Sequence, residues 1–172
     1  GLRACLRAGD RKADRRSGVV MIGRRLLLGA MPAALVVEGC AGPPAPPVVD
    51  LTVRANPDIN PNPAGTPVSV AVRLYSLNAR GRFEAADVYS LMQREAQTLG
   101  TESTGSEEVV VRPGETRKVT LMPKPGVRFI GIAVLFRDID RAQWRMVAPI
   151  AESGLTRLAI SISGTRAALV PT

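Results

Sequence analysis

Short runs in which apolar and polar residues alternate recur from residue 48 onward, and they constrain the fold more than any other feature of the sequence. In VVDLTVRA, Val49, Leu51 and Val53 share one face, and PVSVAVRLYSL repeats the pattern. This period of two is typical of β-strands with one buried face. By contrast, residues 129–136 are continuously apolar, which predicts a central strand covered on both faces. Further runs, which bring the total to about seven or eight strands, are EEVVVR, TRKVTLM, QWRMVAPI, LTRLAISIS and TRAALV.

Two connections between these runs have distinct signals. The sequence PGE at 113–115 has the residues of a tight turn, so EEVVVR and TRKVTLM are predicted to form a hairpin. The segment FEAADVYSLMQREAQTLG spaces its apolar residues as a helix does, with Asp87 as N-cap and Gly100 as stop. We predict one helix over about 88–97, inserted into an all-β fold, a two-sheet antiparallel β-sandwich.

The first 39 residues differ from the strand region. From a possible start at Met21, MIGRRLLLGAMPAALVVEGC passes through paired arginines and an apolar stretch to a cysteine. This order is typical of a secretory signal. The apolar stretch, residues 26–37, would be about 18 Å long as a helix, which is too short to span a bilayer comfortably. We interpret residues 1–39 as leader and signal peptide, with general and twin-arginine export both open.

Cys40 ends the apolar stretch directly after Gly39, and this resembles the lipobox of bacterial lipoproteins, although Val37 and Glu38 depart from its usual residues. The other cysteine, Cys5, lies in the leader, so Cys40 has no disulfide partner after cleavage. A free thiol is the alternative to acylation. The following GPPAPP predicts an extended tether. The predicted organisation is a lipidated cysteine and tether over 40–47 and a single domain over 48–172.

The charge of the chain is concentrated at its start. The net charge is +8, but residues 1–39 hold eight of the 23 basic residues and three of the 15 acidic ones. From Cys40 onward the net charge is therefore only +3. No basic stripe alternates with the few aromatic residues, so we predict no nucleic-acid binding.

Residues that could perform catalysis are scarce. The sequence contains no histidine, which excludes Ser-His-Asp systems and histidine metal sites. Asp138 and Asp140 are the nearest approach to a carboxylate pair, but they lie between two strands, where aspartates commonly occupy turns. Trp144, in an alternating run, is predicted to fill the core. We predict no catalytic residue, metal ligand or cofactor.

An ordered set of segments follows the lipobox-like cysteine: NPDINP, VSVAVRLYSL, FEAADVYSLMQREAQTLG, RPGETRKVTL and RFIGIAVLFRDIDRAQWR. This set, over about residues 51–149, resembles the TssJ (VasD/SciN) family of type VI secretion lipoproteins. The resemblance implies a transthyretin-like sandwich with added helical elements, no enzymatic activity, and an acylated protein on the periplasmic face of the outer membrane. It also implies binding to the periplasmic C-terminal region of the inner-membrane protein TssM, which associates with TssL, so that the membrane complex is anchored to the outer membrane.

The same resemblance assigns partner binding to the loop between the first two strands, residues 56–67. Its prolines restrict the backbone, which lowers the entropy lost on docking. Ile59 is the only large apolar side chain there that could anchor a partner. The residues alone leave an ordinary surface connection as the alternative. The residues predicted to contact TssM are Asn56, Pro57, Asp58, Ile59, Asn60, Pro61, Asn62 and Pro63.

A second function remains open, that of a periplasmic solute- or carbohydrate-binding β-sandwich lipoprotein. Such a protein needs a groove lined by exposed aromatic side chains. The chain is poor in aromatic residues, which counts against this alternative, and no small-molecule substrate is expected. The candidates for lining such a groove are Tyr75, Phe83, Tyr89 and Trp144.

Overall fold

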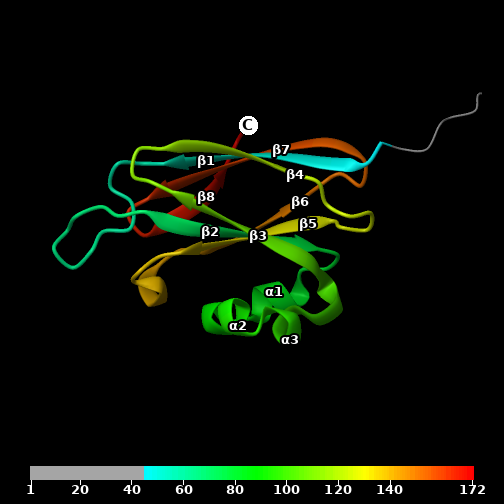
Figure 1. The fold of residues 1–172 in the computed structure, drawn as a ribbon, viewed down its shortest axis with the longest axis horizontal. Helices are drawn as coiled ribbons and strands as arrows, with labels where there is room; N and C mark the ends of the chain where they lie inside the picture. Colours follow the sequence, from blue (N-terminus) through cyan, green and yellow to red (C-terminus); the bar gives the residue numbers. More distant parts are fainter. Residues whose placement is uncertain (1–44) are drawn as a thin grey trace, which may run out of the picture. The chain divides into compact units, whose positions relative to one another are not determined.

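Residues 45–172, the part of the chain that this computed structural model describes, form two four-stranded sheets packed face to face (Figure 1). Sheet A has the order β4-β1-β7-β8, and sheet B has the order β3-β2-β5-β6. The predicted signal peptide and Cys40 lie outside the described residues. The strands are β1 (Pro47–Ala55), β2 (Val70–Leu77), β3 (Ser103–Val111), β4 (Thr116–Leu121), β5 (Phe129–Leu135), β6 (Arg145–Pro149), β7 (Gly154–Ser163) and β8 (Arg166–Val170).

The predicted two-sheet sandwich is confirmed, with one departure in strand direction. β1 pairs antiparallel with β4 but parallel with β7, whereas the other strand pairs of both sheets are antiparallel. A parallel pair requires a long crossover between its strands. Here all the strands of sheet B lie between β1 and β7 in the chain, which provides that crossover. The alternation of residues within a strand shows which face is buried but not the direction in which the strand pairs, so it could not predict this parallel pair.

The predicted hairpin of residues 107–122 is wrong. Its two strands belong to different sheets, because β3 pairs with β2 in sheet B and β4 pairs with β1 in sheet A. The turn itself forms as expected, and the Glu115 amide donates to the Arg112 carbonyl at 3.0 Å. Turn residues dictate a local reversal of the chain, but the partner of each strand is chosen by long-range pairing.

The alternating residues of the strands meet between the sheets and form the main core. Val49, Leu51 and Val53 of β1 are buried there, as predicted. β5 is buried at five consecutive positions, 130–134, and lies inside sheet B, which confirms the predicted central strand. Residues Ala41–Thr172 form a compact unit, and it contains every residue of both hydrophobic clusters, so this unit can fold on its own.

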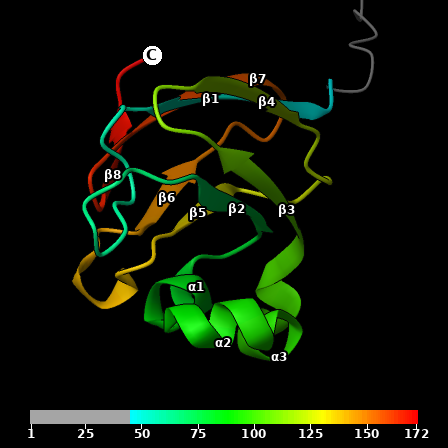
Figure 2. The same ribbon diagram turned by 60° about the vertical axis from the view of Figure 1, so that its left-hand side comes forward.

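The outer face of sheet B is covered by short helices rather than by the single predicted helix (Figure 2). The chain leaves helical geometry at Arg94, and a hydrogen bond of 3.1 Å from Thr98 Oγ1 to the Ser90 carbonyl closes the bend. Asp87 caps a helix and Gly100, at φ +52°, ends one, as predicted. The elements are α1 (Gly81–Ala85), α2 (Val88–Gln93), α3 (Glu95–Leu99) and a 3-10 turn, η1 (Gly100–Glu102).

Helices this short are unstable alone, so packing on the sheet holds them. Their apolar side chains complete a second cluster, the helix-side core, against the outer face of sheet B. This tertiary burial outweighs the local preference for one continuous helix. The fully buried members of the helix-side core are Tyr75, Leu77, Phe83, Leu91, Leu99 and Ala133.

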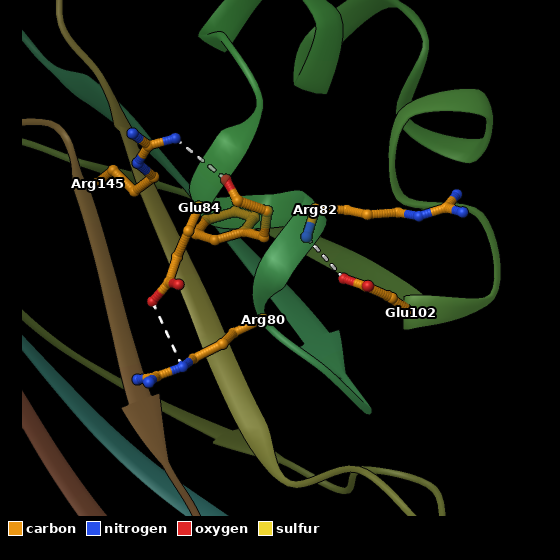
Figure 3. Close-up of polar contacts among 6 residues, drawn as sticks. Arg80, Arg82, Glu84, Glu102 and Arg145 are labelled. Carbon is orange, nitrogen blue, oxygen red and sulfur yellow. Dashed lines mark hydrogen bonds and ion pairs between the residues drawn. The ribbon is translucent and has the colours of Figure 1, made fainter.

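Polar contacts tie α1 to the strands and to η1 (Figure 3). Arg145 of β6 donates from Nη1 to the carbonyls of Phe83 and Ala86, at 3.1 and 2.7 Å, and so satisfies acceptors at the end of α1. The Arg82 amide donates to Glu102 Oε2 at 2.9 Å, which satisfies a donor at its start. The helical layer is thereby fixed on sheet B, away from sheet A.

Gly131 of β5 allows the ring of Phe83 to lie against the sheet. A Cβ at this position would stand 2.9 Å from Leu77 Cδ1 and 3.0 Å from Phe83 Cζ. We expect Gly131→Ala to lower the free energy of unfolding by about 1–3 kcal/mol, measured by urea denaturation, because the core is overpacked. Gly81→Ala in α1 is the control, since its Cβ would have ordinary contacts. Equal stability of the two variants would contradict the close packing at Gly131.

Candidate functional site

The loop between β1 and β2 projects from one end of the sandwich, beside the β7–β8 turn and the connection between β5 and β6 (Figures 1 and 2). Its base is held by backbone hydrogen bonds. The Asn56 amide donates to the Ile162 carbonyl of β7 at 2.9 Å, and the Asn56 carbonyl accepts from Gly114 of the β3–β4 turn at 3.2 Å. Ser163 Oγ donates to the Asp58 carboxylate at 3.1 Å. The loop is therefore braced by β7 of sheet A and by the β3–β4 turn.

Ile59 and Asn60 point into the protein. Ile59 is 0% exposed and belongs to the main core, so its predicted role as an exposed apolar anchor for a partner is wrong. A lone isoleucine between polar residues looked available for docking, but the loop folds back far enough to bury it. Asn60 is 3% exposed and adopts a left-handed conformation with φ +49°.

Asn60 joins three separate segments. Its Nδ2 donates to the Ser69 carbonyl at 2.9 Å, and its Oδ1 accepts from the Arg137 amide at 2.8 Å. Its own amide donates to the Gly164 carbonyl at 2.7 Å. Asparagine tolerates positive φ better than most residues, so the conformation and the hydrogen bonds suit the same side chain. Asn60 is therefore a structural residue beneath the loop.

The tip of the loop, residues 61–66, closes on itself. Asn62 Oδ1 accepts from the amides of Ala64 and Thr66 at 3.0 and 2.9 Å, and the Asn62 amide donates to the Thr66 carbonyl at 2.9 Å. Gly65 supplies a positive φ of +79° that the turn requires. Five of the six tip residues are exposed, and Asn62 is half-buried. The tip is thus an ordered protrusion that presents the rings of Pro61 and Pro63.

A shallow pocket separates the tip from the segment that follows β5. Pro61, Asn62 and Pro63 form one wall, and Arg137 and Asp138 form the other. Sequence reasoning missed Arg137, Ser163 and Gly164 as supports of the loop. No local pattern could have identified them, because they are far from the loop in the chain and contribute mostly backbone groups.

The other sequence candidates do not assemble into a chemical site. Asp138 and Asp140 lie at the 3-10 turn η2 (Ile139–Arg141), as expected of turn aspartates, although Asp138 makes no side-chain capping bond. Within residues 45–172, no group of three or more metal-ligating side chains occurs. In the same residues, no helix is long and apolar enough to cross a membrane.

The aromatic side chains do not form a binding groove in the described domain. Tyr75 and Phe83 are fully buried, and their ring centroids lie 5.2 Å apart in the helix-side core. Trp144 is half-buried and packs against both hydrophobic clusters, so it fills the core only in part. Tyr89, 54% exposed, is left as the one exposed aromatic residue of those described. This arrangement gives no support to the carbohydrate-binding alternative.

The described residues thus form a two-sheet sandwich with helices on sheet B and a braced loop at one end. Residues 47–165 match the family model described as type VI secretion lipoprotein, VasD, EvfM, TssJ, VC_A0113. The chain belongs to this family of type VI secretion lipoproteins, which confirms the resemblance inferred from the ordered segments. A search of curated protein sequences gave no match.

Solved structures of similar proteins agree with this assignment. The type VI secretion lipoprotein TssJ1 from Pseudomonas aeruginosa is 30% identical, with a TM-score of 0.69 over 76% of this chain and 99% of that chain. Lip from Serratia marcescens, a membrane-bound component of the type VI secretion system, shares the fold at 21% identity, with a TM-score of 0.69 over 74% of this chain and 99% of Lip. A structure described as the TssM C-terminal domain from EAEC contains a chain 29% identical, with a TM-score of 0.61 over 73% of this chain and 98% of that one.

Proposed function

We propose that this chain is the outer-membrane lipoprotein of a type VI secretion membrane complex, and that it anchors the complex by binding the periplasmic C-terminal region of TssM. Membership of the lipoprotein family supports the general role. A chain 29% identical to this one occurs in a structure described as the TssM C-terminal domain, which supports TssM as the partner. TssL joins through TssM, and acyl chains on Cys40 hold the protein on the periplasmic face of the outer membrane.

The observation that carries this proposal is the braced loop tip. A protruding segment that is already ordered loses little conformational entropy when it docks. The tip is closed by three hydrogen bonds at Asn62 and is held from below by Asn60. In this arrangement the tip contacts TssM through Pro61, Asn62 and Pro63. Ile59 and Asn60 act from beneath, and the exposed Asn56, Pro57 and Asp58 lie at the edge of the contact.

A replacement confined to the tip tests the proposal. We expect that exchanging residues 61–66 for a Gly-Ser linker of equal length, with Ile59 and Asn60 kept, leaves the domain folded. Affinity for the TssM periplasmic region should fall by about 30-fold or more, because interface anchors and their order are lost together. Isothermal titration of the purified unit Ala41–Thr172 against that region measures the effect.

The matched control is residues 151–153, the exposed part of the β6–β7 connection, which lies at the opposite end of the sandwich. The same Gly-Ser exchange there should leave the affinity for TssM unchanged. A tip variant that binds TssM as tightly as the parent would reject the loop as the docking element.

A further inference from the structure

The outer face of sheet A is not covered by other elements of the described domain, whereas the helices lie on sheet B (Figures 1 and 2). Arg54, Lys118 and Arg157 occupy outward positions, because the register aligns Lys118 and Arg157 with Thr52 and Asp50, which alternate with the core residues of β1 as Arg54 does. The register places Arg157 beside Asp50 and Lys118 beside Thr52. None of the ion pairs formed within residues 45–172 includes any of the three cations.

These side chains surround a shallow hollow on the face. It is lined from β1, β4 and β7, and Thr172, the last residue of the sequence, also borders it. Asp50 is the one acidic side chain in the lining, and its carboxylate accepts a hydrogen bond from Thr120 Oγ1 at 2.9 Å. The side chains of the hollow therefore carry a net positive charge, which suits an anionic partner.

An apolar rim adjoins the basic hollow where the chain enters β1. Met122 is 81% exposed and Leu155 is 47% exposed. Leu155 pairs with Val48, and Met122 follows Leu121, which pairs with Val49, so the two exposed side chains flank the start of β1. Exposed apolar side chains next to unpaired cations are typical of surfaces that rest on a membrane interface.

We propose that this face of sheet A rests on the anionic headgroups of the membrane. Met122 and Leu155 insert among the headgroups, and the three cations Arg54, Lys118 and Arg157 bind lipid phosphates.

The orientation of the domain on the membrane rests on the proposed acylation of Cys40. Between Cys40 and Pro47 the tether spans about 22 Å when extended, at about 3.1 Å per residue. Such a short tether keeps the domain at the surface and raises the effective concentration of lipid around the face. The loop tip lies at the other end of β1 and stays accessible to TssM.

Vesicle binding by the unit Ala41–Thr172, which lacks Cys40 and hence any acyl chain, tests this assignment. We expect cosedimentation with phosphatidylcholine vesicles that contain phosphatidylglycerol, little with phosphatidylcholine alone, and weaker binding in high salt. The double variant Lys118→Gln, Arg157→Gln should bind about 25-fold more weakly, at about 5-fold per removed charge. The double variant Met122→Ser, Leu155→Ser should also bind the anionic vesicles more weakly.

The control is the double variant Arg80→Gln, Arg94→Gln, which removes two charges on the helical side of the domain. It should bind the vesicles like the parent.

Three results would overturn the assignment. They are equal binding to neutral and anionic vesicles, unchanged binding by the Lys118 and Arg157 variant, and binding that depends on charge but not on Met122 and Leu155. The last would mean that the face attracts any polyanion. Titrations with TssM separate this inference from the proposed function. Loss of vesicle binding with normal TssM affinity rejects only the lipid contact, and absent TssM affinity with normal vesicle binding rejects only the partner.

Discussion

Replacing Ile59 by alanine is expected to lower the free energy of unfolding by about 3 kcal/mol, within the range of about 2–5 kcal/mol seen for large-to-small changes in cores. Ile59 is 0% exposed and belongs to the main core, although it lies in a loop. The substitution removes three carbon atoms and leaves a cavity that the loop cannot fill easily, because the segment on either side of it is held by hydrogen bonds. Urea denaturation of the unit Ala41–Thr172 measures the loss.

Met122→Ala is the control for this prediction. It also shortens a large apolar side chain, but one that is 81% exposed, so stability should change by less than about 0.5 kcal/mol. The opposite outcome is equally informative. If Ile59→Ala kept its stability and lost TssM binding, the side chain would be a surface anchor, and its burial in the main core would be contradicted.

The second large effect is expected at Asn60. Asn60→Ala should lower the free energy of unfolding by about 2–4 kcal/mol, because it removes two hydrogen bonds and places alanine at positive φ. The lost bonds are those to the Ser69 carbonyl and from the Arg137 amide. Since they hold the loop beneath its tip, we also expect TssM affinity to fall by about tenfold or more, measured at a temperature at which the variant is fully folded.

Asn60→Gly separates the two causes. Glycine loses the same side-chain hydrogen bonds but adopts φ +49° without strain. We therefore expect the glycine variant to be more stable than the alanine variant by about 1 kcal/mol. Full stability in both variants would show that the side chain of Asn60 does not hold the loop. If both variants were less stable but bound TssM with normal affinity, the hydrogen bonds of Asn60 would support the fold without contributing to partner binding.

Much of the sandwich could be predicted because its signals are local. A strand that buries one face must alternate, and Val49, Leu51 and Val53 do so. A strand buried on both faces cannot alternate, and residues 130–134 do not. The hydrogen bonds from the Ser90 hydroxyl and the Ser90 amide to the Asp87 carboxylate also follow from neighbouring residues, and they lower the pKa of that carboxyl.

The candidate site was predicted less well. The sequence indicated the loop and its prolines, but it presented Ile59 as available to a partner. Whether a loop residue is buried depends on which segments pass beneath it. Here these include Arg137 and Gly164, which are remote from the loop in the chain. The division of the helical segment at Arg94 has the same origin, because it depends on packing against sheet B.

The sequence by itself determined the period of the strands, the composition of the core, the position of the turns and the family of the chain. Tertiary structure alone decided which strands pair, so that β3 and β4 separate into different sheets and β1 runs parallel to β7. It also decided that Ile59 and Asn60 support the loop and that Arg54, Lys118 and Arg157 gather on one uncovered face of sheet A. The physical reason is that side-chain period and turn chemistry act over a few residues. Strand partners and burial are set by hydrogen bonds and apolar contacts between segments distant in the chain.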